Sequence, residues 1–473
     1  MTIPVLYDYQ QKIIADTREA LRTSKSVLVV APTGSGKSVI TAAMFKSAIS
    51  KGKTAYFCVH RKDLVTQMAG TFKRFNIPFG YIASGRTRNP CMPVQICSVQ
   101  TLANRIERTP APDVLVVDEA HFSCSKSYSR IIDLYKLKGT VIIGKTASPS
   151  RLSGEGLGKH FSSMVVGPTV KTLMDDGFLS KYKIYAPSAP VLTGIKTRAG
   201  DYVEADLLDA VDKPSITGDA VTHYLKYANG MRTVAFCVSI THSEHVAQAF
   251  RSAGINAQHV DYKTKPETRM QYFNDFADGK IKILTSVAIF SEGLDLAALV
   301  GREVCIEAAI LLRPTKSLTM YLQQVGRALR KKDYHAVILD HAGNCREHGL
   351  PDEEREWQLS DRQKAKKSDS SDEKEERVKI CPECYMVHEP DPKCPECGFI
   401  YPVREIKPDE IEGDLEEIDI DAERLAKKKQ QGRAESLPDL VALGASRGYK
   451  NPRSWARHVY NSRVAKRMSE KHG

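Results

Sequence analysis

Short apolar runs alternate with stretches of helical periodicity over the first 180 residues. Five runs rich in β-branched residues predict strands at residues 27–30, 54–59, 94–98, 114–117 and 140–144. Longer stretches whose apolar positions recur every three or four residues, such as 38–50 and 63–75, predict helices between them. This order is typical of a parallel sheet covered by helices, so we predict an α/β domain over residues 1–180.

The same alternation starts again after a proline-containing stretch near residues 185–190. Strands are predicted at 232–237, 257–261, 280–285, 303–307 and 336–340, and helices at 241–253, 264–277 and 317–329. We therefore predict a second α/β domain, in tandem with the first, over residues 181–350. The pattern assigns no element to residues 194–219.

The chain changes character after residue 350. Residues 351–379 are charged and rich in serine, which predicts a linker. A small cysteine module follows at 380–402, and a second charged stretch at 403–435 again predicts a linker. Residues 436–473 predict a basic helical hairpin, because Asn451 and Pro452 can begin a second helix after a break at Gly448.

The formal net charge of +12 is unevenly distributed along the chain. Basic residues dominate 1–350 and 427–473, whereas acidic residues dominate 351–426, a distribution that favours a protein that binds a polyanion. No apolar run approaches the ~18 residues of a membrane-spanning helix, and the N-terminus lacks the pattern of a secretory signal. We therefore expect no membrane segment and a cytoplasmic location.

A glycine-containing loop, Ala31-Pro-Thr-Gly-Ser-Gly-Lys-Ser38, lies between a predicted strand and a predicted helix. Small residues let the backbone N–H groups of such a loop close around the phosphates of a nucleotide. The ammonium of Lys37 can reach the β- and γ-phosphates, and the hydroxyl of Ser38 can hold Mg²⁺. The loop predicts an ATP site formed by Thr33, Gly34, Ser35, Gly36, Lys37 and Ser38.

Two carboxylates follow the apolar run at 114–117, in the sequence Asp118-Glu119-Ala120-His121. Hydrolysis of Mg²⁺-ATP needs an oxygen ligand for the metal and a group that positions the attacking water. At the end of a strand, Asp118 can reach the metal directly or through water. We predict Asp118 as the second Mg²⁺ ligand and Glu119 as the group that orients and deprotonates the water.

A glutamine and two arginines share one face of the predicted helix at 317–329 and its end, because Gln323, Arg327 and Arg330 are spaced by four and three residues. Guanidinium groups bind phosphate through paired hydrogen bonds and stay charged, so they suit a phosphoryl group in transfer. If the second domain presents them to the loop of the first, ATP lies between the domains. The predicted catalytic residues are Lys37, Asp118, Glu119, Gln323, Arg327 and Arg330.

Over residues 3–345 the chain resembles the superfamily 2 helicases of the DEAH type, which have two RecA-like domains. The segments above resemble their motifs I, II and VI, and Thr146-Ala147-Ser148-Pro149 resembles motif III, with serine where threonine is usual. The resemblance implies that Gln10 reads adenine and that Gly293 and Asp295 of motif V contact the nucleotide. It also implies coupling residues, which are His121, Thr146 and Ser148. Motifs Ia, Ib and V imply a set of nucleic-acid-binding residues, which are His60, Arg61, Gln67, Ser98, Gln100 and Thr285.

Within that superfamily, residues 311–315, 321–324 and 339–344 and the cysteine module are similar to those of the bacterial RadD DNA-repair helicases. This likeness implies single-stranded or branched DNA as a partner, with RNA possible, in a bacterial or phage-encoded protein associated with the nucleoid. The chain is shorter than typical members. Its residues 351–473 are a candidate docking segment for a repair or replication protein.

Four of the eleven cysteines form the array Cys381-x₂-Cys384-x₉-Cys394-x₂-Cys397. Each pair can present two thiolates from one tight turn, and two such turns complete the tetrahedron that Zn²⁺ prefers. We predict a zinc ribbon with a structural ion, the alternative being iron in a rubredoxin-like site. His388 lies between the pairs and is predicted to be a surface residue rather than a ligand.

The tail interleaves basic and aromatic residues between Tyr449 and Arg467. Such a segment can grip phosphates while its rings stack on bases, or it can dock on a partner. Trp455 and Val459 have core spacing, so we expect Trp455 to pack within the hairpin.

Taken together, these patterns predict an ATP-dependent DNA helicase or translocase whose ATPase activity nucleic acid stimulates. Three alternatives stay open: an RNA helicase, the motor subunit of a restriction or defence complex, and a non-catalytic docking adaptor.

Overall fold

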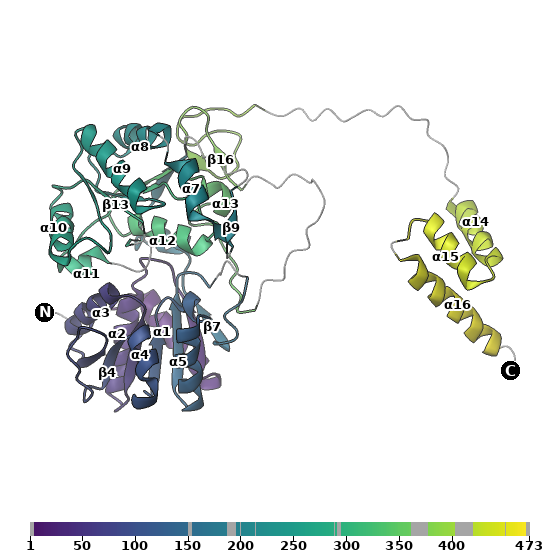
Figure 1. The fold of residues 1–473 in the computed structure, drawn as a ribbon, viewed down its shortest axis with the longest axis horizontal. Coiled ribbons are helices and arrows are strands. Elements are labelled where there is room, and N and C mark those ends of the chain that lie inside the picture. Colours follow the sequence, from purple (N-terminus) through teal and green to yellow (C-terminus); the bar gives the residue numbers. More distant parts are fainter. Residues whose placement is uncertain are drawn as a thin grey trace. The chain divides into compact units, whose positions relative to one another are not determined.

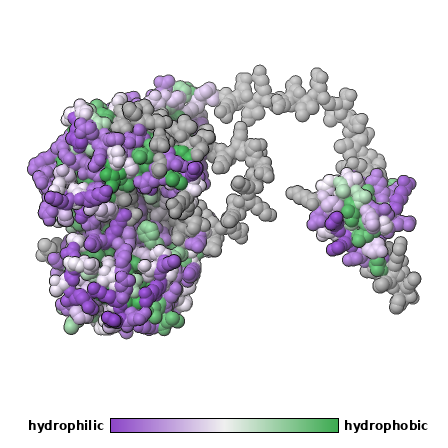
Figure 2. Space-filling model, viewed as in Figure 1, coloured by the Kyte–Doolittle hydropathy of each residue, from purple (hydrophilic) through white to green (hydrophobic). Residues whose placement is uncertain are grey.

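The computed structural model describes residues 4–149, 154–186, 195–198, 200–212, 214–287, 289–290, 295–360, 377–402, 420–449 and 451–469. The chain forms two compact units, Met1–Tyr401 and Pro402–Gly473. The first unit contains two lobes, each built on its own sheet (Figure 1). Figure 2 shows a mostly hydrophilic face on this unit, with small separate apolar areas. None of the described helices is both long and apolar enough to cross a lipid bilayer.

The first lobe is a parallel sheet of seven strands in the order β3-β4-β2-β5-β6-β1-β7. Its strands are β1 (Ser26–Val30), β2 (Ala55–Val59), β3 (Phe79–Ile82), β4 (Val94–Ser98), β5 (Val114–Val117), β6 (Val141–Thr146) and β7 (Ser163–Val166). Its helices are α1 (Asp8–Thr23), α2 (Lys37–Ile49), α3 (Lys62–Arg74), α4 (Val99–Arg105), α5 (Lys126–Leu137) and α6 (Val170–Asp175), with short 3₁₀ turns at Ile106–Arg108 and Ala120–Phe122.

All five strands predicted for this lobe are present, and the pattern missed only the two at the sheet edges among the strands described there. The central strands β1, β2 and β4 are buried along their whole length, because helices cover both faces of a parallel sheet. The edge strands β3 and β7 are partly exposed, so their sequences lack a continuous apolar run.

The second lobe is a parallel sheet of six strands in the order β12-β13-β11-β14-β15-β8. Its strands are β8 (Tyr182–Tyr185), β11 (Thr233–Phe236), β12 (Ala257–His259), β13 (Ile283–Ser286), β14 (Ala308–Leu311) and β15 (Ala336–Asp340). Its helices are α7 (Glu204–Val211), α8 (Pro214–Tyr227), α9 (Ile240–Ser252), α10 (Pro266–Ala277), α11 (Leu296–Val300), α12 (Leu318–Ala328) and α13 (Asn344–His348). A small antiparallel pair, β9 (Thr197–Arg198) and β10 (Asp201–Tyr202), precedes α7.

The strand predicted at 303–307 is wrong, because the structure places β14 at Ala308–Leu311. This strand begins with two alanines, which have a weak preference for strands, yet it is fully buried in the middle of the sheet. Residues 194–219, which the pattern left unassigned, contain the β9–β10 pair and α7 and the start of α8.

Residues 350–360, called the strap here, leave the second lobe and return to the first. The linker predicted at 351–379 is therefore wrong over 351–360, and residues 361–376 lie outside the described part of the chain. Trp357 and Leu359 pack against a core cluster of the first lobe, and the carbonyl of Leu359 accepts a hydrogen bond of 2.8 Å from the amide of Gly158. At its other end, the guanidinium of Arg355 donates to the carbonyl of His348 in the second lobe and to that of Leu350 at the start of the strap.

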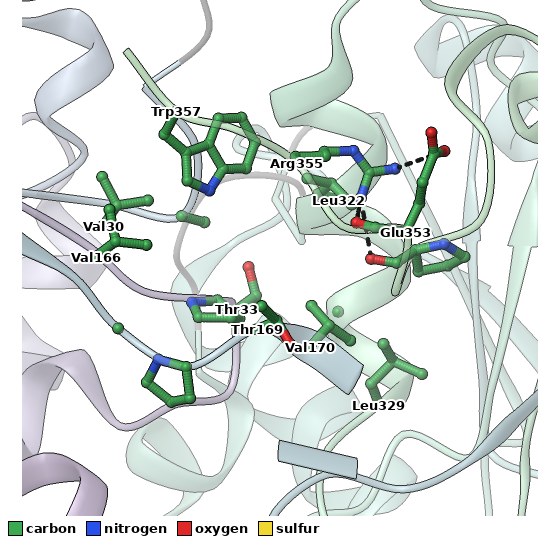
Figure 3. Close-up of a pocket in the computed structure, with 16 residues that line it drawn as sticks. Val30, Thr33, Val166, Thr169, Val170, Leu322, Leu329, Glu353, Arg355 and Trp357 are labelled. Carbon is green, nitrogen blue, oxygen red and sulfur yellow. Dashed lines mark hydrogen bonds and ion pairs between the residues drawn. The ribbon is translucent and has the colours of Figure 1, made fainter. Parts of the chain in front are cut away.

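The strap closes one side of a small apolar cavity of about 80 Å³ between the lobes. Figure 3 shows Trp357 on the side of Val30 and Val166, with Glu353 and Arg355 on the side of Leu322. The lobes are therefore joined both by the chain between the two sheets and by the strap.

The cysteine module contains the strand pair β16 (Lys379–Ile380) and β17 (Val387–His388), and it packs on the edge strand β8 of the second lobe. The amide of Ala186 donates to the carbonyl of Tyr385 over 3.0 Å, and the ammonium of Lys183 lies 2.8 Å from a carboxylate oxygen of Glu396. The module thereby covers a sheet edge that would otherwise be open.

The second unit contains α14 (Ile420–Arg433), α15 (Leu437–Ser446) and α16 (Pro452–Ser469). Helices α15 and α16 form the predicted hairpin, with Trp455 and Val459 packed against its core. The linker predicted at 403–435 is wrong over 420–433, where α14 has no apolar stripe that would reveal it. The guanidinium of Arg463 donates to the carbonyls of Gln431 and Ala434 at the end of α14.

Candidate nucleotide site and cysteine cluster

A cavity of about 650 Å³ lies between the two lobes and collects most of the predicted nucleotide residues. The predicted residues that line it are Gln10, Thr33, Gly34, Gly36, Lys37, Ser38, Asp118 and Glu119 from the first lobe, and Asp295, Arg327 and Arg330 from the second. Ser35 does not line the cavity but hydrogen-bonds residues that do. Gly293 lies outside the described residues.

The loop after β1 is shaped by two glycines in left-handed conformations, Gly34 at φ +90° and Gly36 at φ +79°. Side chains rarely adopt this backbone conformation, and a Cβ on Gly36 would also lie 2.5 Å from Nε2 of Gln10. The ammonium of Lys37 donates to the carbonyls of Ala31 and Pro32 over 3.0 and 3.1 Å. Burial lowers the pKa of Lys37 to about 8, although the carboxylates of Glu119 and Asp118 oppose the shift. A phosphate group would supply this buried ammonium with a stronger partner than the carbonyls do.

Glu119 is at the centre of a hydrogen-bonded chain that crosses from one lobe to the other. Its Oε2 accepts a hydrogen bond of 3.0 Å from Nε2 of Gln323 on α12, and it lies 3.4 Å from Nδ1 of His121. Nδ1 of His121 is 3.3 Å from the hydroxyl of Thr146, which donates to the carbonyl of Ser148. Glu119 also has a positive φ of 47°, which is unusual for a residue with a side chain.

Arg327 on α12 and Arg330 just after the end of this helix both line the cavity, but they have different partners. Arg327 is almost fully buried, and its Nε donates to the carbonyl of Phe290 over 2.8 Å. Burial lowers the pKa of Arg327 to about 10, with a further contribution from Arg330, so the guanidinium stays charged near neutral pH. Arg330 forms an ion pair of 2.6 Å with Asp295. Burial alone would raise the pKa of Asp295, but the charges of Arg330 and Arg327 hold it below its ordinary value.

Aromatic side chains border the cavity beside Gln10. The ring of Phe178 lies 4.7 Å from that of Tyr7 and 4.9 Å from that of Tyr9, between ring centroids. Nε2 of Gln10 and the hydroxyl of Tyr9 both donate to the carbonyl of Ser35, so this corner is tied to the phosphate loop. Flat apolar rings next to an amide suit a purine base. Phe178 belongs to no motif and is not among the residues predicted from the sequence.

Ser38 and Asp118 offer a hydroxyl and a carboxylate oxygen to the same cavity, a pair of hard oxygen ligands that fits Mg²⁺. The ammonium of Lys145 on β6 also lies beside Asp118, with its Nζ 3.5 Å from Oδ1 of the carboxylate. Burial lowers the pKa of Lys145, and Asp118 opposes that shift. Lys145 is not among the residues predicted from the sequence.

The predicted nucleic-acid residues are not equally accessible. The hydroxyl of Thr285 donates to the carbonyl of Ser243 and is fully buried, so its contact with a nucleic-acid strand stays a prediction. Ser98 is buried and caps α4 by accepting from the amide of Thr101, which is a structural role. His60 and Gln100 lie together, since the amide of Gln100 donates to the carbonyl of His60 over 3.4 Å.

Two other predicted nucleic-acid residues join the lobes to each other. Oε1 of Gln67 accepts a hydrogen bond of 2.9 Å from the amide of Asp295, and the guanidinium of Arg61 lies 5.1 Å from the ring centre of Tyr262. Next to them, Asp63 and Arg269 form an interlobe ion pair of 3.2 Å. In this conformation, helix α3 therefore contacts the second lobe.

The four predicted zinc ligands form a compact cluster. The Sγ atoms of Cys381, Cys384, Cys394 and Cys397 all lie within 4.8 Å of one another. Tyr385 and Gly398 follow the two pairs at matching positions, and both have positive φ angles, of 60° and 77°. His388 is not a surface residue as predicted, because it is buried and its Nε2 lies 2.8 Å from the hydroxyl of Tyr401. Four thiolates converging from two turns fit a structural Zn²⁺ ion.

We expect the Cys384→Ser variant to lose its metal and to unfold at a lower temperature than the original protein. A module of this size buries too little apolar surface to stay folded without its ion, and its loss exposes the edge of β8. Metal content by mass spectrometry and thermal unfolding of the whole chain measure both effects. Cys91→Ser is the matched control, because Cys91 is an exposed cysteine of the first lobe. Equal metal content in the two variants would contradict the assignment.

Sequence comparisons agree with this arrangement of two lobes. The family described as "Type III restriction enzyme, res subunit" matches residues 3–151, and "Helicase conserved C-terminal domain" matches residues 217–332. A 51.5 kDa protein of a Lactococcus phage (isolate 7-9) is 32% identical over 380 residues, which cover 80% of this chain and 79% of that protein. The chain belongs to the superfamily 2 helicases, so the resemblance seen in its motifs is confirmed.

More distant proteins share the same part of the chain. "Putative ATP-dependent helicase IRC3" of Saccharomyces cerevisiae is 29% identical over 369 residues, which cover 72% of this chain and 52% of the yeast protein. The chain thus spans about half the length of that relative. The solved fragment of a "putative HsdR subunit of a type I restriction enzyme" from Vibrio vulnificus has a TM-score of 0.56 at 18% identity, covering 74% of this chain and 67% of that fragment. This likeness confirms the tandem RecA-like fold.

Proposed function

We propose that the protein is a nucleic-acid-stimulated ATPase that translocates on or unwinds DNA. The observation that carries this proposal is the cavity between the lobes, to which one lobe supplies Lys37 and Glu119 and the other supplies Arg327. Neither lobe alone has both the phosphate loop and the arginines. Hydrolysis is thereby linked to the contact between lobes.

Each residue has a defined part in the proposed reaction. Lys37 exchanges its loop carbonyls for the β- and γ-phosphates, and Gln10 with the rings of Tyr7 and Phe178 holds the base. Glu119 takes a proton from the attacking water while Gln323 keeps its carboxylate oriented. Arg327 and Arg330 stabilise the charge on the transferring phosphoryl group. A Mg²⁺ ion held by Ser38 and Asp118 would neutralise phosphate charge.

The contacts of Glu119 suggest how hydrolysis reaches the nucleic acid. Gln323 and His121 connect Glu119 to the second lobe and to Thr146, while His60 of motif Ia and Gln100 of motif Ib lie together. Loss of the γ-phosphate would change the partners of Glu119 and of the arginines together. A movement between the lobes then shifts the strand-binding residues of one lobe against those of the other.

We assign DNA as the preferred polymer, single-stranded or branched, and a role in repair, recombination or replication. The likeness to RadD-type helicases supports this choice, as does the DNA 3'-5' translocase XPB2 of Sulfurisphaera tokodaii, which is 23% identical over 376 residues. The second unit supplies a further contact, because Arg453, Arg457 and Tyr460 of α16 are exposed. We also place the protein in the cytoplasm of a bacterial cell, at the nucleoid, a choice that its 32% identity to a protein of a Lactococcus phage supports.

The experiment that tests the proposal compares ATP turnover with single-stranded DNA, forked DNA, duplex DNA and RNA of equal length. We expect turnover to rise at least tenfold with single-stranded or forked DNA and less with RNA. A strand-displacement assay on the same substrates separates unwinding from translocation alone. Stimulation by RNA but not by DNA would overturn the choice of polymer, and no turnover on any substrate would favour the docking adaptor.

A second candidate function is the motor subunit of a restriction or defence complex. The match of residues 3–151 to a restriction-enzyme family favours it, as does the EcoAI endonuclease subunit of Escherichia coli, which is 25% identical over 371 residues. We find no nuclease motif in this sequence. Cleavage of DNA by the purified chain alone, with ATP present, would therefore contradict both candidate functions as stated.

A further inference from the structure

Lys145 is a charged residue inside an otherwise apolar strand. Strand β6 reads Val-Ile-Ile-Gly-Lys-Thr and lies between β5 and β1 in the centre of the first sheet. The side chain of Lys145 is only 3% exposed. A buried ammonium is unfavourable unless nearby groups compensate its charge, so its surroundings indicate what it does.

The sheet register places Lys145 beside Asp118. Val117 pairs with Gly144, so the next residues, Asp118 just after β5 and Lys145 still within β6, lie side by side. Nζ of Lys145 is 3.5 Å from Oδ1 of Asp118, and it donates a hydrogen bond of 3.2 Å to the carbonyl of Lys37 at the start of α2. Its other side faces the ring of Phe57, 4.8 Å from the ring centre. Lys145 thus lies beneath the phosphate loop and against the predicted metal ligand.

The ammonium of Lys145 would therefore compete with Mg²⁺ for the carboxylate of Asp118. Asp118 lines the nucleotide cavity, where its oxygen atoms can ligate Mg²⁺, yet the ammonium of Lys145 already lies against it. A positive charge so close to a ligand weakens the attraction of that ligand for a divalent cation. The same ammonium keeps Asp118 paired when the cavity holds no cation.

We propose that Lys145 is a positioning residue that holds Asp118 between turnovers and competes with Mg²⁺ for it, which weakens the binding of Mg²⁺-nucleotide. Release of Mg²⁺-ADP is then favoured, because Lys145 restores a partner to Asp118 as the cation leaves. This inference rests on the proposed function only in taking Asp118 as the metal ligand.

The test is a calorimetric titration of the full chain with ADP and Mg²⁺, which needs no turnover. We expect Lys145→Met to bind Mg²⁺-ADP about tenfold more tightly than the original protein, and Lys145→Arg to bind it with unchanged affinity. ADP without Mg²⁺ should bind the methionine variant no more tightly. Lys53→Met is the matched control, because Lys53 also pairs with an aspartate of the first lobe, Asp113, away from the cavity. Unchanged or weaker binding of Mg²⁺-ADP to Lys145→Met would overturn the inference.

Two further variants distinguish a failure of the inference from a failure of folding or of the metal site. Lys145→Gln, which removes the charge but can still donate to the carbonyl of Lys37, must also bind Mg²⁺-ADP more tightly, and it replaces the methionine variant if that one does not fold. In an Asp118→Asn background the effect of Lys145→Met should vanish, as expected for two groups that act through each other. If Asp118→Asn itself leaves Mg²⁺-ADP affinity unchanged, the metal site of the proposed function fails. If it weakens binding but Lys145→Met has no effect, only the inference fails.

Discussion

Replacing Arg327 with alanine should lower the kcat of ATP hydrolysis by about 10³-fold or more, while the KM for ATP changes much less. Arginines that stabilise a phosphoryl group in transfer contribute this much to the rate elsewhere. The guanidinium of Arg327 comes from the second lobe and faces the cavity that holds Lys37 and Glu119. Steady-state turnover with saturating single-stranded DNA measures the loss.

The controls for this variant address its burial. Arg327 is almost fully buried and bonds the carbonyl of Phe290, so removal of the side chain can also loosen the second lobe. Arg327→Lys keeps a positive charge but not the planar fork, and it should be nearly as inactive as the alanine variant. Arg302→Ala is the matched control, because Arg302 pairs with Asp278 on the surface of the same lobe. Normal turnover by Arg327→Lys would contradict a role for the guanidinium in the reaction.

The Glu119→Gln variant should bind ATP with normal affinity and hydrolyse it about 10²–10⁴-fold more slowly, the range of contributions from a positioned general base. The amide has the size of the carboxylate, and its oxygen can still accept the hydrogen bond from Gln323. The interlobe contact is therefore preserved while the base is lost. Single-turnover hydrolysis and binding of ATP distinguish the two effects.

Glu107→Gln is the control for this prediction, because Glu107 is a well-exposed carboxylate of the first lobe that pairs with Arg130. A Glu119→Gln protein with normal single-turnover rates would show that another group deprotonates the water. Slow turnover combined with weakened ATP binding would instead point to a disturbed phosphate loop.

Most of the predicted nucleotide residues line one cavity because several of them follow the carboxyl ends of buried strands. Strands β1 and β5 are apolar apart from Ser26, so the segments that follow them, with Lys37 and Asp118, stand out as polar residues at the same sheet edge. The helix that carries Gln323 and Arg327 was also recognised from its spacing. The pattern does not show which residues of the two lobes contact each other.

The structural features that the sequence does not predict have physical causes of their own. The predicted strand at 140–144 stops before Lys145, whereas β6 continues to Thr146. Thr285 belongs to a motif, but the motif could not show that its hydroxyl is bonded to Ser243. Phe178 belongs to none, and only the fold brings its ring to Tyr7 and Tyr9. The strap was taken for a linker because charged residues outnumber the two side chains that anchor it, Trp357 and Leu359.

The path of the strap has a consequence for how this protein can be divided. The backbone visits the first lobe, then the second, returns to the first at Leu359, and ends its course through this unit on the second, at the cysteine module. No single cut therefore yields two complete halves: a fragment that stops at residue 350 lacks the tryptophan that finishes its own N-terminal half. Each lobe is therefore built from segments that are not consecutive in the sequence.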